Sequence, residues 1–302
     1  MTKYLPLIYV LLFTLFWSLQ IFVSKLGFLA GLRLLPFLFQ SSLLVFLLLG
    51  GYICLTKFKQ LRKVPKRVSI RLFWASALHA GLGGLLSTVA ILYTTAINVA
   101  FLFQFTTVTT AVLAWLILKE KMTKGKILTI VLVMIGIFLF ITSGKLITPH
   151  IGDLFALGAC IAWSLGNVLI RGVLKENPVD ADVSTFFRGV GNLSVAVILI
   201  VLVPFYPLVF KSIAQTNLFS LNLFPYIFLN ALFVSLLCIF LNRALKVASA
   251  SYMTIMSSLS PIIVAVLAFA FLHETLNTVQ LFGAGFIVFG GIITQYLKID
   301  KH

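Results

Sequence analysis

Long apolar stretches follow one another along the whole chain, and short polar connections separate them. The stretches are continuously apolar and do not alternate, which favours helices over strands. About 20 apolar residues in a helix are enough to span a bilayer. The pattern therefore predicts an all-α integral membrane protein with ten transmembrane helices, at residues 5–24, 35–55, 72–92, 98–118, 127–143, 152–171, 186–209, 224–243, 250–271 and 278–297.

A short signature repeats within this pattern. The tripeptide Trp-Ser-Leu occurs at residues 17–19 and 163–165, each time inside an apolar run and with a basic residue eight positions after the Trp. A second pair of segments, 96–136 and 250–290, matches at an offset of 154 residues. The chain is therefore expected to contain two copies of one five-helix unit, residues 1–150 and residues 151–302.

Composition agrees with a membrane protein, since 61% of the residues are hydrophobic and only 10% are charged, against about 25% charged in soluble domains. In a soluble protein the net charge of +16 would suggest a nucleic-acid partner. Here the basic residues crowd the connections 57–71 and 119–126, between apolar stretches. We therefore expect the lipid bilayer as a partner and no nucleic-acid partner. A cytoplasmic N-terminus places 18 of the 23 Lys and Arg residues inside, as the positive-inside rule requires.

Five helices per copy is an odd number, so the second copy must enter the membrane in the opposite sense. The charges agree: residues 1–150 contain 15 basic and one acidic residue, and residues 151–302 contain eight and six. We therefore predict two inverted repeats in the inner (plasma) membrane, crossing it many times, with both termini in the cytoplasm. Inverted repeats around a midplane site are the usual construction of alternating-access carriers.

Several motifs of the second copy carry a family resemblance. Residues 242–245 read Asn-Arg-Ala-Leu, residues 259–261 read Leu-Ser-Pro, Glu274 follows, and glycines recur from 283 to 291. This pattern resembles the drug/metabolite transporter superfamily, specifically the EamA-type ten-helix permeases. The resemblance implies two five-helix lobes around a central cavity that opens alternately to each side. The first copy departs from it, because Thr107 stands where the second copy has Pro261.

Polar and aromatic side chains within the predicted spans are the candidates for contact with a substrate, because such groups are costly in hydrocarbon unless they face a cavity or a partner helix. Pro261 would kink the ninth span and is the candidate for a moving element. Hydrogen bonding or packing between helices is the alternative for each candidate. The cavity candidates are Trp17, Gln20, Asn98, Gln104, Thr107, Trp163, Asn167, Tyr252, Ser257 and Ser260.

The seven carboxylates lie at the ends of predicted helices or in loops. No span therefore offers a buried proton relay or an anionic sodium site, and a facilitator or exchanger is favoured over a carboxylate-driven pump. The spans also lack the paired acids or the His and carboxylate set that a membrane-embedded enzyme would need. We expect no enzymatic activity, no metal and no cofactor.

The sequence thus predicts a permease that moves a small organic metabolite, such as an amino acid or a related compound, by alternating access, as an exporter or exchanger. A lipid scramblase or a channel-like protein is the alternative. The partners expected are a small-molecule substrate and the bilayer. Glycines in the last helix suit either a homodimer through the last helices or packing within one chain.

Overall fold

The computed structural model describes residues 5–142, 151–202 and 221–296. Within these residues the chain is helical and contains no strand, which confirms the all-α prediction. Eight stretches are long and apolar enough to cross a membrane. They are Leu5–Leu29, Leu34–Thr56, Lys66–Tyr93, Ala96–Leu118, Ile151–Glu176, Ala181–Leu202, Phe224–Val247 and Ala250–Leu272.

Several of these stretches consist of more than one helical segment. The elements are α1 (Leu5–Leu29), α2 (Leu34–Thr56), α3 (Phe58–Arg62), α4 (Lys66–Ser76), the π-helical segment η2 (Ala77–Gly83), α5 (Gly84–Tyr93), α6 (Ala96–Leu102), α7 (Phe105–Leu118), α8 (Lys124–Thr142), α9 (Ile151–Glu176), α10 (Ala181–Leu202), α12 (Phe224–Val247), α13 (Ala250–Met256), the 3-10 turn η4 (Ser257–Leu259), α14 (Ser260–Leu272) and α15 (Thr278–Tyr296). The helices α8 and α15 take the places of the fifth and tenth predicted spans.

Two predicted spans begin too late in the sequence. The third span begins at Lys66 instead of residue 72, and the seventh begins at Ala181 instead of residue 186. The first turn of each of these two helices contains polar residues, so the apolar pattern begins later than the helix does. As a result Arg188, which lies near the start of the predicted seventh span, lies two turns inside α10. The predicted span residues 143, 203–209 and 297 lie outside the described part of the chain.

The basic residue of the repeated signature makes the same kind of contact in both copies, a hydrogen bond to a carbonyl oxygen at the end of a helix. Lys25 Nζ donates a hydrogen bond to the carbonyl oxygen of Thr94 at 2.6 Å, just after α5 ends. Arg171 Nη1 donates to the carbonyl oxygen of Leu245 at 2.6 Å, in the last turn of α12. The last carbonyls of a helix lack partners within the helix, and a basic side chain there is favourable. The signature thus caps the third span of each copy.

The fourth and ninth spans are both interrupted at equivalent places. The fourth span breaks at residues 103–104, between α6 and α7, and the ninth span passes through η4 between α13 and α14. Pro261 lies in the first turn of α14. N–H groups in a first turn have no acceptor within the helix, so the N–H that proline lacks costs no helical hydrogen bond there. Since Thr107 occupies the equivalent position in the first copy, the break does not depend on proline.

Two glutamates connect the copies reciprocally. The Glu274 carboxylate accepts hydrogen bonds from two N–H groups in the first turn of α6, including that of Ala96, at 2.9 and 3.0 Å. The Glu120 carboxylate accepts from the Ser251 hydroxyl at 2.8 Å and the Ala250 N–H at 3.3 Å, in the first turn of α13. Each copy therefore supplies the negative charge that a helix N-terminus favours to the broken span of the other copy.

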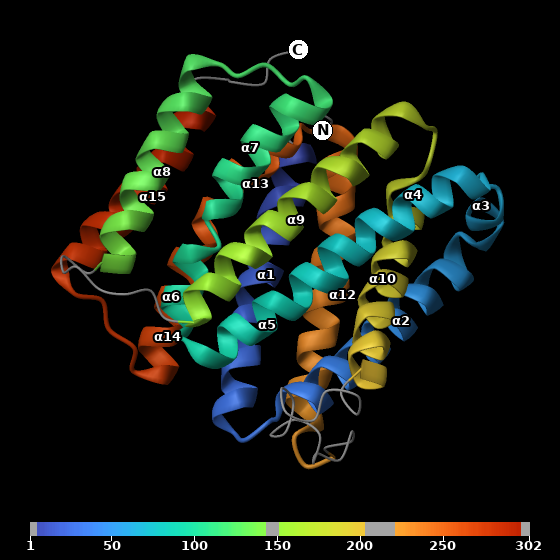
Figure 1. Cartoon of the computed structure of the whole chain (residues 1–302), viewed down its shortest axis with the longest axis horizontal. Helices are drawn as coiled ribbons and strands as arrows, with labels where there is room; N and C mark the ends of the chain where they lie inside the picture. The colour runs from blue at the N-terminus through green and yellow to red at the C-terminus, as the bar shows by residue number, and fades with distance from the viewer. Residues whose placement is uncertain (1–4, 143–150, 203–220, 297–302) are drawn as a thin grey trace.

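The helices α8 and α15 lie side by side at one edge of the molecule, on the left in Figure 1. In the remaining bundle α1 packs along α12, and α10 packs against α2 and η2. The helix α9 contacts η2, α5 and α7. The inner faces of α1, α2, α9, α10 and α12 meet at the centre of this bundle, where the candidate site lies.

Candidate functional site

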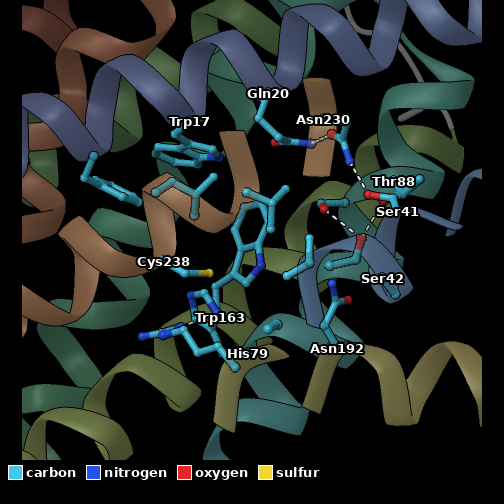
Figure 2. A pocket seen from close by; sticks show the side chains of 18 of the residues that line it. Trp17, Gln20, Ser41, Ser42, His79, Thr88, Trp163, Asn192, Asn230 and Cys238 are labelled. Atoms are coloured by element: carbon cyan, nitrogen blue, oxygen red, sulfur yellow. Dashed lines mark hydrogen bonds between the residues drawn. The ribbon is translucent and has the colours of Figure 1, made fainter. Parts of the chain in front are cut away.

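A cavity lies between the two copies at the centre of the bundle (Figure 2). Its walls come from α1, α2, η2, α5 and α7 of the first copy and from α9, α10, α12, α13 and η4 of the second. The unfilled space between these walls, counting the part open to solvent, is about 940 Å³. Among the described residues that line it there is no Asp or Glu.

Aromatic rings form one wall of the cavity. The ring centroids of Trp17 and Trp163 are 5.8 Å apart and their planes are nearly perpendicular. Phe103 lies behind them, with its centroid 4.6 Å from that of Trp163. Gly83 makes room for the Trp163 ring, because a Cβ atom there would lie 2.4 Å from Trp163 Cδ1. This wall presents apolar ring surface to whatever occupies the cavity.

A buried cation forms a second part of the lining. Arg188 is fully buried, and its Nε donates to Asn242 Oδ1 at 2.7 Å. Its Nη2 donates to Asn167 Oδ1 at 3.0 Å, and its Nη1 lies 2.6 Å from His79 Nδ1. Because a guanidinium group can only donate, His79 Nδ1 must accept and the proton of the neutral ring must sit on Nε2. We call these four residues the cationic cluster.

Glycines and an irregular helix bring the cationic cluster together. His79 lies in η2, and π-helical turns are frequent at functional sites. A Cβ atom at Gly166 of α9 would lie 2.5 Å from His79 Cβ, and one at Gly191 of α10 would lie 2.5 Å from the backbone N of Ala77. Only glycine at these two positions allows α9 and α10 to approach η2 so closely.

A neutral group of polar side chains includes three other residues of the lining, Gln20, Ser41 and Asn230. Gln20 Nε2 donates to Asn230 Oδ1 at 3.1 Å and to Ser24 Oγ at 3.0 Å, and Ser24 Oγ donates to Asn230 Oδ1 at 2.8 Å. Asn230 Nδ2 donates to Ser41 Oγ at 2.6 Å, and Figure 2 shows this chain of bonds crossing from α1 to α2. We call Gln20, Ser24, Ser41 and Asn230 the amide cluster.

An ion-pair network joins α2, α10 and α12 away from the cavity. The cavity residues of α2 lie in its first half, from Phe37 to Val45, whereas the network lies at its other end. There Asp182 accepts from Arg243 at 2.6 and 2.8 Å and pairs with Lys57 at 3.1 Å. Burial lowers the pKa of Lys57, but hydrogen bonds to Asp180 and Asp182 outweigh this effect and raise the pKa above its usual value. The network ties three helices together at one end.

The structure brings five of the predicted site residues to the cavity. These are Trp17, Gln20, Trp163, Asn167 and Ser257. They come from the first helix of each copy and from the break in the ninth span, so the repeated signature does meet at the centre. Their contact with a substrate stays a prediction.

The other predicted site residues lie away from the lining. Asn98 donates to Asp153 at 2.9 Å, where the fourth span begins. Ser260 Oγ lies 2.9 Å from Ser18 Oγ, and Thr107 donates to the backbone of the ninth span at 3.5 Å. Tyr252 is half-buried against the hydrophobic core. Gln104 is 1% exposed, and its side-chain amide has no hydrogen-bond partner among the described residues.

Arg188 and His79 are the main residues that sequence reasoning did not place at the site. Asn230 and Ser41 of the amide cluster were likewise not singled out. The signal for Arg188 was available, because a basic residue two turns inside an apolar helix is rare and marks function by default. An earlier start for the seventh span would have revealed it.

Comparisons with known proteins agree with this architecture. The model of the EamA-like transporter family matches residues 5–142 and again residues 150–295. An uncharacterized transporter of Clostridium kluyveri is 29% identical over 95% of this chain and 91% of its own. The uncharacterized transporter YyaM of Bacillus subtilis (strain 168) is 26% identical over 71% of this chain and 69% of its own. A crystal structure that is 11% identical matches 97% of this chain and 96% of its own with a TM-score of 0.68, which shows the fold alone.

Proposed function

Because the chain belongs to the EamA-like transporter family, we propose that it is a permease that moves a small organic metabolite, such as an amino acid or a related compound. The family and the similar proteins are all described as transporters. The observation that carries the proposal is the cavity between the two copies, with aromatic and polar walls. Transport runs by alternating access, as an exporter or exchanger.

Three structural features support alternating access. The cavity residues of α2 and α12 lie in the first half or the middle of these helices, whereas the ion-pair network around Asp182 ties the helices together at the opposite end. The fourth and ninth spans are broken beside the centre, so their halves can move separately. The reciprocal contacts of Glu120 and Glu274 lie where the copies would move against each other.

The membrane arrangement is part of the same proposal. We place α8 and α15 across the membrane as well, which gives ten spans in two inverted repeats with a boundary between residues 150 and 151. Opposite directions of α1 and α9 support the inversion, since Lys25 near the end of α1 and Asp153 at the start of α9 both lie beside residues 94–98. The proposed location is the inner (plasma) membrane with both termini in the cytoplasm. Exposed Phe282 and Phe289 on α15 suit either lipid or a homodimer through the last helices.

Counterflow of labelled metabolites into reconstituted vesicles tests the proposal. Saturable uptake that depends on unlabelled metabolite inside the vesicle is the expected result. Flux without saturation would identify a channel or a lipid scramblase instead, and the absence of flux for amino acids, organic acids, nucleosides and sugars would refute the proposal.

A pair of tryptophan variants then tests the cavity itself. Trp163→Ala should reduce uptake, because the ring forms part of the wall. Trp115→Ala is the matched control, since this ring is 49% exposed and lies outside the lining. Equal uptake by the two variants would show that the aromatic wall does not contribute to transport.

A further inference from the structure

Arg188 carries a positive charge that no described residue compensates. Its three partners are the side chains of His79, Asn167 and Asn242, all of which are neutral when they accept its hydrogen bonds. Among the described residues no carboxylate lies within ion-pair distance of this guanidinium group. Asp182 on the same helix is engaged by Arg243 and Lys57.

An uncompensated cation is costly in this place. Arg188 is fully buried, and the hydrogen bonds that it donates to neutral acceptors replace only part of the hydration that it loses. Charged side chains within membrane spans persist where they pair with an opposite charge or serve a substrate path. Since Arg188 borders the cavity, an anionic ligand bound in the cavity can supply the compensating negative charge.

The donors around Arg188 suit a carboxylate. Only three of its five N–H groups have partners in the described chain, which leaves one on each terminal nitrogen. His79 carries its proton on Nε2, and Asn167 Nδ2 has no partner among the described residues. The cluster therefore offers several donors and a full positive charge, and it offers no negative group to repel an anion.

The other lining residues indicate which chemical groups the rest of the ligand contains. The rings of Trp17 and Trp163 favour an aromatic or aliphatic group. A zwitterionic or cationic ligand would place its ammonium group in a lining whose described residues include no Asp or Glu. Within the proposed class of metabolites, this favours a carboxylate without an ammonium group over an amino acid. Building on the proposed function, we infer that the substrate is an organic monocarboxylate anion, whose carboxylate binds the cationic cluster and whose apolar body lies against the aromatic wall.

Thermal unfolding of the purified full chain tests the charge preference. The probes are phenylacetate, its neutral isostere phenylacetamide, the cation phenethylammonium, and chloride, all at equal concentration and ionic strength. Phenylacetate should raise the Tm, and the other three should not. A rise with phenylacetamide or phenethylammonium that equals the rise with phenylacetate would overturn the inference, as would an equal rise with chloride or no rise with phenylacetate and a series of longer carboxylates.

Variants assign the effect to Arg188. Arg188→Gln should weaken phenylacetate binding about 10- to 100-fold, since the charge-assisted bonds are lost. Arg188→Lys should retain part of the affinity, because it keeps the charge without the fork of donors. Arg71→Gln is the matched control, because Arg71 forms an exposed ion pair with Glu176. If Arg188→Gln does not fold, unweakened binding by Arg188→Lys together with equal binding of phenylacetamide refutes the inference.

The counterflow assay separates the two proposals. Saturable uptake of neutral or cationic compounds with no uptake of carboxylates would refute the substrate class and leave the permease intact. Binding of phenylacetate that depends on Arg188, without saturable flux of any compound, would refute the permease and leave the anion site intact. Saturable uptake of phenylacetate that Arg188→Gln reduces about tenfold or more supports both.

Discussion

Gly83 and Gly84 are neighbours in the third span, but only Gly83 touches the aromatic wall. A Cβ atom at Gly83 would lie 2.4 Å from Trp163 Cδ1, whereas one at Gly84 would meet Asn192 Oδ1 at 3.7 Å. Ordinary contact begins near 3.4 Å, so Gly83→Ala requires the indole ring to move by about 1 Å in a close-packed interior. Gly84→Ala requires no movement.

The two alanine variants should therefore change stability in opposite directions. Overpacking costs about 1–3 kcal/mol, whereas Gly→Ala in a helix contributes about 0.5–1 kcal/mol where alanine fits. We expect Gly83→Ala to be destabilised by about 1–2 kcal/mol and Gly84→Ala to be slightly stabilised. Thermal unfolding of the purified variants measures the difference, and the fluorescence of Trp163 should change only in Gly83→Ala. A Gly83→Ala protein as stable as Gly84→Ala would refute the packing argument.

Three further substitutions probe the contacts that hold the copies together, each measured by thermal unfolding. Glu274→Gln should lower the free energy of unfolding by about 1–2 kcal/mol, because a neutral amide binds the α6 N-terminus more weakly. Glu176→Gln is the exposed control and should change this energy by less than about 0.5 kcal/mol. Equal losses in the two variants would contradict the capping role of Glu274. Arg171→Gln should cost about 1–2 kcal/mol, since it frees carbonyls at the end of α12, and an unchanged Tm would contradict this. Asp182→Asn should cost about 2–3 kcal/mol, because it leaves Arg243 without its charge partner; a loss no larger than that of Glu176→Gln would show that the network contributes little.

The elements of the fold could be predicted because apolar runs of helical length leave few alternatives in a bilayer. The repeated signature predicted equivalent positions, and Lys25 and Arg171 make similar contacts, each with a carbonyl oxygen at the end of a helix. Boundaries were less accurate where a helix begins with polar residues. The seventh span begins five residues earlier than hydropathy indicated, at Ala181 instead of residue 186, and this difference concealed Arg188.

The site was less predictable than the fold because it depends on which helix faces are neighbours. Gln104 is one of the predicted cavity residues, but only the tertiary structure shows that this side chain is buried away from the cavity. The contact between His79 and Arg188 joins residues 109 positions apart. It also requires a π-helical turn and two close glycine contacts, for which the sequence pattern contains no specific signal.

The difference between the copies at one equivalent position explains why the two sides of the cavity are unlike. In the first copy Gln20 extends a side chain that binds Asn230 and completes the amide cluster. In the second copy Gly166 has no side chain, and the Cβ atom of His79 occupies the space beside it. The ring of His79 then contacts Arg188. The difference between Gln20 and Gly166 at this position accompanies a neutral group of side chains on one side and a cationic group on the other. A monocarboxylate would therefore lie in the cavity in one orientation, with its charge toward the second copy.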